Sequence, residues 1–228
     1  MKKHEFANTT DLNAAFAERI TSLLEQGIQD AGRASLLVSG GRTPTALFQL
    51  LSQQSLDWSK VDVSLVDERW VSDTDDASNT KMIKAHLLQN NAAQANFVGL
   101  VTDAENAQDA VSACTDNLKN IKQPFDVLIL GMGEDGHTAS LFPCSEQIKA
   151  GLNRSSTARY IAVQPTTAPH QRMSLTLGAI LTSQNIFLHL TGTGKKAVLK
   201  QALSGDNPLE MPIRAVLQNA DVELMWAP

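Results

Sequence analysis

Short apolar segments alternate with segments of helical periodicity along this chain, and that alternation constrains its fold more than any other feature. The segment 125–130 is almost wholly apolar, which is typical of a strand that is covered on both faces. A strand followed by a helix, repeated with mostly short connections, favours a parallel sheet with helices on both sides. We therefore predict an α/β fold with a doubly wound, mostly parallel sheet.

The same patterns place the individual elements. Leu12, Phe16 and Ile20 repeat at helical spacing behind Thr10, which we expect to cap that helix. Because ligands of such sheets bind at the carboxyl ends of the strands, the residues after each strand are the candidates for a site. Further helices are predicted at residues 44–51, 79–88, 104–118, 172–181 and 195–203. Strands are predicted at residues 35–38, 61–66, 97–100, 125–130, 160–163, 185–190 and 222–226.

Length and charge limit the number of domains and the kind of partner. The chain has 228 residues and no linker rich in Gly, Ser or Pro, so we predict a single domain over residues 1–228. The formal net charge is −5, and the sequence contains no cluster of Lys and Arg. Since binding a polyanion needs clustered basic residues, we expect no nucleic-acid partner.

The sequence contains no signal for export or for membrane insertion. The first residues lack the apolar core of a secretory signal, and no apolar run approaches the roughly 20 residues that span a bilayer. The two cysteines, Cys114 and Cys144, lie far apart among neutral neighbours, and we expect both to be reduced thiols. These observations predict a cytoplasmic protein with no membrane partner.

The first candidate segment is Ser39–Pro44, directly after a predicted strand. Gly40 and Gly41 allow a tight turn and a close approach of backbone to a ligand. Thr43 suits a helix cap and Pro44 the first helical position. Free N–H groups at such a helix start favour an anion, typically a phosphate, although an ordinary strand–helix turn has the same pattern.

A second candidate segment, Asp67–Trp70, follows the predicted strand at 61–66. Three consecutive charged residues at the end of a strand commonly face solvent without any role in binding. Here the strand aims them at the expected crevice, which favours Asp67 and Arg69 as ligand-facing residues.

The third segment, Gly131–His137, contains a formal G-x-G-x-x-G. A dinucleotide site also requires an acidic residue about 20 positions further on, and this sequence has Ser and Thr there. The alternative is that the glycines admit a small ligand while His137 acts as general base and acid near neutral pH. Asp135 then either orients the imidazole or contacts the substrate.

Basic residues are expected at the start of two helices, where they oppose the helix dipole. Arg172 falls in the first turn of the predicted helix 172–181, and Lys195 and Lys196 open the helix at 195–203. Two such helices at the ligand edge suggest a bound anion that more than offsets this cost.

Other chemistries find less support. The sequence has no G-x-S-x-G nucleophile elbow and no G-x-x-x-x-G-K-[ST] phosphate loop. The five histidines are scattered without metal-ligand spacing, and the cysteines form no C-x-x-C. We therefore expect no metal site.

At these segments the chain resembles the 6-phosphogluconolactonase family over about residues 6–226. The run D-G-H-T-A-S-L-F-P is the most specific part of the resemblance, whereas S-G-G-x-T-P is shared with related sugar-phosphate proteins. The segments that carry it are Ser39–Pro44, Asp67–Val71 with Ser78 and Asn79, Gly131–Pro143, Arg172–Thr176 and Gly192–Lys195.

The resemblance implies a Rossmann-like domain without a metal or organic cofactor that hydrolyses 6-phospho-D-glucono-1,5-lactone to 6-phosphogluconate in the pentose phosphate pathway. His137 would be the general base, with Asp135 and Asp67 as further catalytic residues. The partner would be the sugar-phosphate lactone, and the chain a monomer or weak homodimer. The residues implied to bind substrate are Ser39, Gly40, Gly41, Arg42, Thr43, Arg69, Asn79, Gly133, Arg172 and Lys195.

Two alternatives remain at this stage. The glucosamine-6-phosphate deaminase family shares the fold, but it places a Glu five residues after the His, where this chain has Phe142. A phenylalanine cannot carry or orient a proton, which favours the lactonase. The other alternative is a non-catalytic module that binds a sugar phosphate. The sequence leaves open whether the 1,5- or the 1,4-lactone is preferred.

Overall fold

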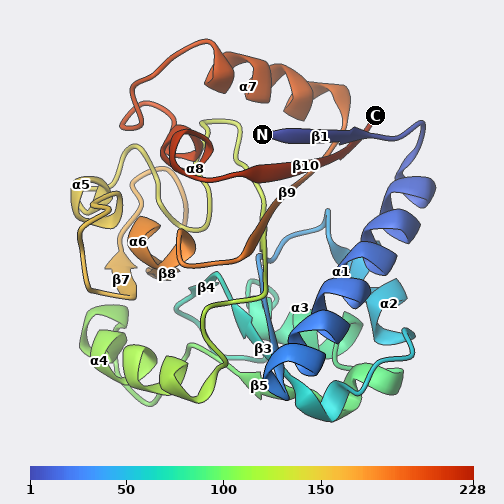
Figure 1. Ribbon diagram of the computed structural model, residues 1–228. Coiled ribbons are helices and arrows are strands. Elements are labelled where there is room, and N and C mark those ends of the chain that lie inside the picture. The colour runs from blue at the N-terminus through green and yellow to red at the C-terminus, as the bar shows by residue number, and fades with distance from the viewer.

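The computed structural model describes residues 1–228 and is built on a sheet of seven parallel strands (Figure 1). Every strand pair in this sheet is parallel, which confirms the predicted fold class. The strands lie in the order β1 (Lys2–Glu5), β10 (Val222–Ala227), β9 (Asn185–Thr191), β6 (Val127–Leu130), β2 (Ala34–Val38), β3 (Val61–Leu65) and β5 (Asn96–Val98).

The direction in which the chain builds this sheet reverses between β2 and β6. From β2 the chain adds β3 and then β5 on one side, whereas from β6 it adds β9 and then β10 on the other. Such a switch point opens a crevice at the carboxyl ends of the two strands. The segments that follow β2 and β6 are the ones that begin at Ser39 and Gly131.

Helices cover the sheet from both sides. Figure 1 shows α1 (Thr9–Ala31) and α2 on one side and α4, α5 and α6 on the other. The cap of α1 is Asn8, whose side chain accepts from Asp11 N at 2.9 Å, so the predicted cap at Thr10 is wrong by two residues. The other helices are α2 (Thr45–Ser52), α3 (Asn79–His86), α4 (Ala107–Asn117), α5 (Ile148–Gly151), α6 (Leu177–Ile180), α7 (Thr193–Leu203) and α8 (Ile213–Asn219), with 3-10 turns at Trp58–Lys60, Asn90–Gln94 and Leu118–Asn120.

A second, antiparallel sheet of three strands was not predicted. It contains β4 (Asp67–Arg69), β8 (Arg172–Leu175) and β7 (Tyr160–Val163), with β8 in the middle. The predicted helix at 172–181 is therefore wrong over its first half. Met173, Leu175 and Leu177 are spaced at two residues as well as fitting a helical pattern, and pairing with strands on both sides decides for the strand.

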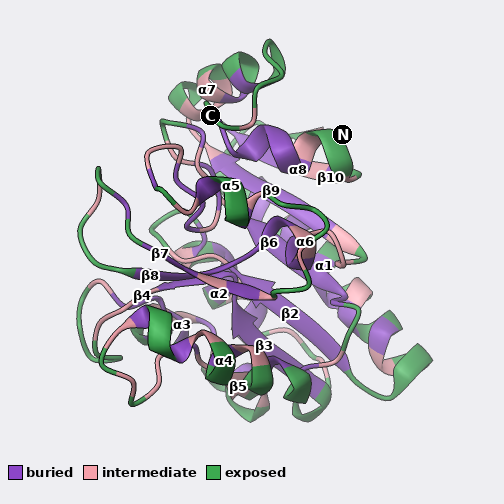
Figure 2. Cartoon of the chain, turned by 90° about the vertical axis from the view of Figure 1, so that its left-hand side faces the viewer, coloured by how far each residue is buried: buried purple, intermediate pink, exposed green.

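The interior is one continuous apolar cluster of 54 buried residues that includes β2, β6 and β9 (Figure 2). All of β2, β3 and β6 is buried, as expected for strands covered on both faces. Cys114 is buried, Cys144 is half-buried, and both are free thiols. No helix combines the length and the apolar character needed to cross a membrane.

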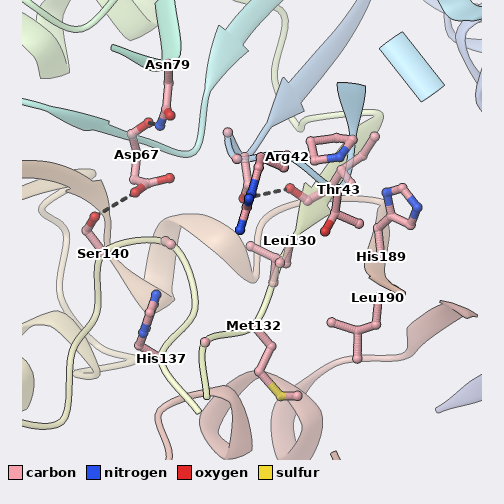
Figure 3. Close-up of a pocket in the computed structure, with 18 of the residues that line it drawn as sticks. Arg42, Thr43, Asp67, Asn79, Leu130, Met132, His137, Ser140, His189 and Leu190 are labelled. Atoms are coloured by element: carbon pink, nitrogen blue, oxygen red, sulfur yellow. Dashed lines mark hydrogen bonds between the residues drawn. The ribbon is translucent and has the colours of Figure 1, made fainter. Parts of the chain in front are cut away.

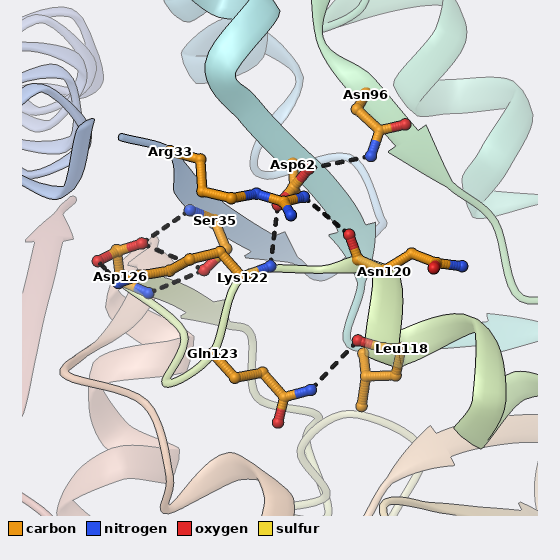
Figure 4. A network of polar contacts seen from close by, with 9 residues as sticks. All are labelled: Arg33, Ser35, Asp62, Asn96, Leu118, Asn120, Lys122, Gln123 and Asp126. Carbon is orange, nitrogen blue, oxygen red and sulfur yellow. Dashed lines mark hydrogen bonds and ion pairs between the residues drawn. The ribbon is translucent and has the colours of Figure 1, made fainter. Parts of the chain in front are cut away.

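A polar network closes the amino-terminal end of the sheet, opposite the crevice (Figure 4). Buried Asp126 accepts from the backbone N–H of Ser35 at 2.8 Å and pairs with Lys122. Buried Asp62 accepts from the guanidinium of Arg33 at 2.5 Å and from the Lys122 N–H at 2.9 Å. Because each buried carboxylate has a cationic partner and a backbone donor, this end of the sheet is fixed without unpaired charge.

Candidate active site

A cavity of about 410 Å³ lies at the switch point, at the carboxyl ends of β2, β6 and β9. Every site residue predicted from the sequence lines this cavity except Asp135, which lies behind His137. Lining residues that were not predicted include Ser140, Phe142, Ala168 and His189. No group of three or more His, Cys, Asp or Glu side chains is arranged to hold a metal ion.

The turn after β2 brings backbone to the cavity, as predicted. A side-chain carbon at Gly40 would lie 1.8 Å from the Asn79 amide oxygen, so only glycine allows this approach. The predicted cap at Thr43 is wrong, because Pro44 occupies the cap position of α2 and no side chain caps the helix. The N-terminal N–H groups of α2 therefore have no side-chain acceptor, which favours an anion at this point.

The loop after β6 wraps around His137. Asp135 Oδ1 lies 2.6 Å from His137 Nδ1 and also accepts the His137 backbone N–H at 3.0 Å. A side-chain carbon at Gly133 would lie 2.1 Å from that same Nδ1. Gly133 thus makes room for the imidazole, while Gly136 has a φ of +74° and packs closely on Met211.

The Asp135–His137 pair sets the chemistry of the ring. Burial raises the pKa of Asp135, but the hydrogen bonds from His137 outweigh burial and leave that pKa below its ordinary value. An ionised Asp135 accepts the proton on Nδ1, so Nε2 of a neutral His137 carries the lone pair. Asp135 is thus hydrogen-bonded to His137, the contact that the first of the two roles left open by the sequence requires.

Phe142 stacks on His137, a contact that sequence reasoning missed. The ring centroids lie 4.1 Å apart at an interplanar angle of 29°. Phe142 is buried, and the Arg172 guanidinium lies 5.8 Å from the centroid of its ring. The imidazole is held on one edge by Asp135 and on one face by this ring, which leaves few orientations open to it.

Arg69 and Arg172 face each other across the small sheet. They are directly opposite in the β4–β8 pair, an arrangement of like charges that is unfavourable without an anion. Burial lowers the pKa of Arg172, and the neighbouring Arg69 lowers it further against the opposing effect of Asp67 and Glu68. The Nε atoms of both arginines are buried without a hydrogen-bond partner. Arg172 was predicted at the start of a helix, but it lies at the start of strand β8. The evidence that it faces an anion is therefore its pairing with Arg69 and not a helix dipole.

Asp67 is a buried carboxylate with one fixed oxygen. Its Oδ2 accepts from the Ser140 hydroxyl at 2.6 Å (Figure 3), and its backbone carbonyl accepts from the Asn79 side chain at 2.8 Å. No protein group donates to Oδ1, so this oxygen is free to accept from a ligand hydroxyl.

Of the two lysines at the start of α7, only Lys195 lines the cavity. Its Nζ pairs with the exposed Glu134 carboxylate at 2.7 Å. Lys196 instead pairs with Glu5 at 2.7 Å and lies 3.9 Å from the centre of the Trp226 ring. The predicted site residue Lys195 is thus at the cavity, whereas Lys196 beside it is not.

His189 lines the cavity from β9 and has no polar partner. Its ring packs edge-on against Phe16 with centroids 5.3 Å apart, and both ring nitrogens are buried without a hydrogen bond. Burial lowers its pKa to about 4, so this ring is uncharged at neutral pH. No signal in the sequence separates it from an ordinary core residue.

Known proteins resemble this chain over its whole length. The family model of glucosamine-6-phosphate isomerases/6-phosphogluconolactonase matches residues 7–226. A 6-phosphogluconolactonase of Pseudomonas putida is 42% identical over 100% of this chain and 93% of that protein. One of Rhizobium meliloti (strain 1021) is 40% identical over 99% of this chain and 98% of that protein. The crystal structure of a 6-phosphogluconolactonase from Shewanella baltica OS155 matches with a TM-score of 0.97 at 44% identity, covering 100% of this chain and 98% of that one.

Proposed function

The chain belongs to the glucosamine-6-phosphate isomerase/6-phosphogluconolactonase family, and from this premise we propose that it hydrolyses 6-phospho-D-glucono-1,5-lactone to 6-phospho-D-gluconate. One observation supports this most directly: a histidine paired to a carboxylate and two neighbouring arginines, Arg172 buried and Arg69 half-buried, share a single cavity. His137 is held by Asp135 at 2.6 Å, and Arg69 and Arg172 lie opposite each other on the same cavity wall.

The first step adds water to the lactone carbonyl. His137 accepts a proton from water at Nε2 while the water oxygen bonds to the carbonyl carbon, and the carbonyl electrons move to its oxygen. Ionised Asp135 stabilises the imidazolium that forms, because its carboxylate accepts the Nδ1 proton. The face of the imidazole stacks on Phe142 at 4.1 Å, which keeps Nε2 directed at the bound water.

The second step opens the ring. The electrons on the former carbonyl oxygen return to the carbon, and the bond from this carbon to the ring oxygen breaks. The imidazolium of His137 gives its proton to the leaving ring oxygen, which becomes the sugar hydroxyl. This transfer leaves the histidine neutral and ready for another water. The new carboxylic acid then releases its own proton to the solvent.

The other residues that line the cavity bind the phosphate and the sugar of the substrate in this proposal. We assign the phosphate to the backbone at Gly40 and Gly41, with Thr43, Arg172 and Lys195, because the start of α2, which no side chain caps, meets two cations there. The sugar and carbonyl end falls to Asp67 and Arg69, with Asn79, Ser39, Arg42 and Gly133 lining the rest of the cavity.

The proposal also covers the cellular compartment and the oligomeric state of the protein. We place the activity in the cytoplasm, on a chain that is a monomer or a weak homodimer. We also propose that residues 1–228 form a single domain. The pairing of β1 near the start with β10 near the end, with Lys2 opposite Glu223, supports this. Size-exclusion chromatography with light scattering tests the oligomeric state.

Freshly generated 6-phosphogluconolactone, coupled to 6-phosphogluconate dehydrogenase, tests the reaction. We expect hydrolysis far above the spontaneous rate, and a much lower kcat/KM for the unphosphorylated lactone. Hydrolysis at the spontaneous rate would refute the proposal. Release of ammonia from glucosamine 6-phosphate would instead favour the deaminase alternative.

A further inference from the structure

Glu68 is fully buried between the two sheets and the start of α3, and it has no direct access to the cavity. Its Oε1 accepts the backbone N–H groups of Arg69 at 2.7 Å and of Asn79 at 2.8 Å. Its Oε2 accepts the backbone N–H of Thr80 at 2.7 Å and the Ser78 hydroxyl at 3.2 Å. Each oxygen thus has two donors, so the carboxylate is satisfied by protein groups alone.

Three of these donors, from Ser78, Asn79 and Thr80, tie β4 to the start of α3. Asn79 and Thr80 are the first two residues of this helix, whose free N–H groups and dipole favour an anion. The residues on either side of Glu68 are Asp67 and Arg69, and Asn79 is itself one of the donors. All three of these neighbours line the cavity.

We propose that Glu68 is a positioning residue for the sugar end of the cavity, because its carboxylate fixes β4 against α3 and thereby sets where the side chains of Asp67 and Asn79 lie. This inference rests on the proposed function. The contacts of those side chains fit it, since Asn79 Nδ2 donates to the Asp67 carbonyl at 2.8 Å and packs on Gly40. A shift of α3 against β4 would move both walls of the sugar site.

Only a carboxylate fits this position. Burial raises the pKa of Glu68, and the backbone N–H groups of Asn79, Thr80 and Arg69 act against burial by favouring the charged form. A glutamine would place an NH₂ group where one oxygen stands, and in either orientation that group meets at least one backbone N–H. The donor left without an acceptor would push β4 and α3 apart.

Glu68→Gln tests the proposal, with Asp126→Asn as the matched control. Asp126 is also a buried carboxylate that accepts a backbone N–H, but it lies at the opposite end of the sheet. The melting temperature of each variant is measured first, and kcat and KM are then measured well below it. The affinity for 6-phosphogluconate is measured by calorimetry as a readout independent of turnover.

We expect Glu68→Gln to lower kcat/KM by about 10²-fold, mainly through KM, and to weaken 6-phosphogluconate binding to a similar degree. The pH at which kcat changes should stay as in the wild type, because Glu68 makes no hydrogen bond to Asp135 or His137. Asp126→Asn should keep wild-type kinetics despite a lower melting temperature. Wild-type kcat/KM in Glu68→Gln, or an equal loss in Asp126→Asn, would overturn the proposal.

The test must also work if Glu68→Gln does not fold or if the wild type has no lactonase activity. If Glu68→Gln does not fold, Ser78→Ala takes its place. It removes one of the two donors to Oε2, together with the helix cap that accepts the Lys81 N–H. We expect kcat/KM to fall by about five-fold, and an unchanged value would overturn the proposal. If the wild type does not hydrolyse the lactone, the proposed function fails by itself. Glu68 is then judged by calorimetry, where equal 6-phosphogluconate affinity in wild type and Glu68→Gln would overturn its role.

Discussion

His189 makes the stability of this protein depend on pH, and the effect can be worked out from one ring. The imidazole is buried with both nitrogens unpartnered, and burial lowers its pKa from 6.5 to about 4. In the unfolded chain the ring returns to its ordinary pKa. The unfolded state therefore binds more protons than the folded state between these two values, so stability falls as the pH falls through this window.

The size of the effect follows from the two pKa values. A shift from 6.5 to about 4 corresponds to about 3 kcal/mol once the pH is below both values, and to about 2 kcal/mol at pH 5. His189→Leu removes the titrating group and the two unpaired nitrogens. We expect this variant to be more stable than the wild type by about 1 kcal/mol at pH 8, with a gap that widens by about 2 kcal/mol at pH 5.

Urea unfolding followed by circular dichroism at pH 8, 6 and 5 measures this gap. The difference between variant and wild type cancels the contribution of every other titrating group. His86→Gln is the control, since His86 is a half-exposed residue of α3 that contacts Gln49 at 3.4 Å, and its stability curve should parallel the wild type. A gap between His189→Leu and wild type that is the same at pH 8 and pH 5 would refute the reasoning.

Substitutions of Asp135, Glu134 and Asp126 test the general base, the phosphate site and the polar network in turn. Asp135→Asn should keep the fold but lower kcat by about 10²-fold or more, because a neutral amide does not stabilise the imidazolium of His137 and can donate to Nδ1, which favours the wrong tautomer. Steady-state kinetics with an unchanged kcat would contradict this. Glu134→Gln frees Lys195 from its ion pair and should lower KM by up to about five-fold, whereas a raised KM would argue against a phosphate role for that lysine. Asp126→Ala leaves its lysine partner buried and unpaired, so we expect urea unfolding to show a loss of about 3–5 kcal/mol; a loss below about 1 kcal/mol would show that the network is dispensable.

Six of the seven strands of the large sheet could be predicted, because local sequence patterns mark them. The edge strand β1 (Lys2–Glu5) was not predicted, since its polar and largely exposed residues show no strand pattern. The run at β6 is apolar throughout, and the glycines after β2 and β6 mark the ends of those strands. These signals depend on neighbours in the sequence. They placed Ser39–Pro44 and Gly131–His137 at one edge, and both segments line the same cavity.

The small sheet could not be predicted, because it depends on pairing between distant segments. Arg69 and Arg172 are opposite each other only through the β4–β8 register, and the pattern around Met173 fits helix and strand equally well. Likewise, Phe142 is one apolar residue among several in the sequence. Its stacking on His137 arises from the turn that joins them, a tertiary contact with no local signal.

The central claim is that His137 activates the water that attacks the lactone, and the kcat of His137→Ala tests it most directly. With freshly generated 6-phosphogluconolactone in the coupled assay, we expect kcat to fall by about 10²–10⁴-fold while the affinity for 6-phosphogluconate stays close to that of the wild type. A kcat within a few-fold of wild type would contradict the account, because the cavity would then hydrolyse the lactone without its only imidazole that is paired to a carboxylate.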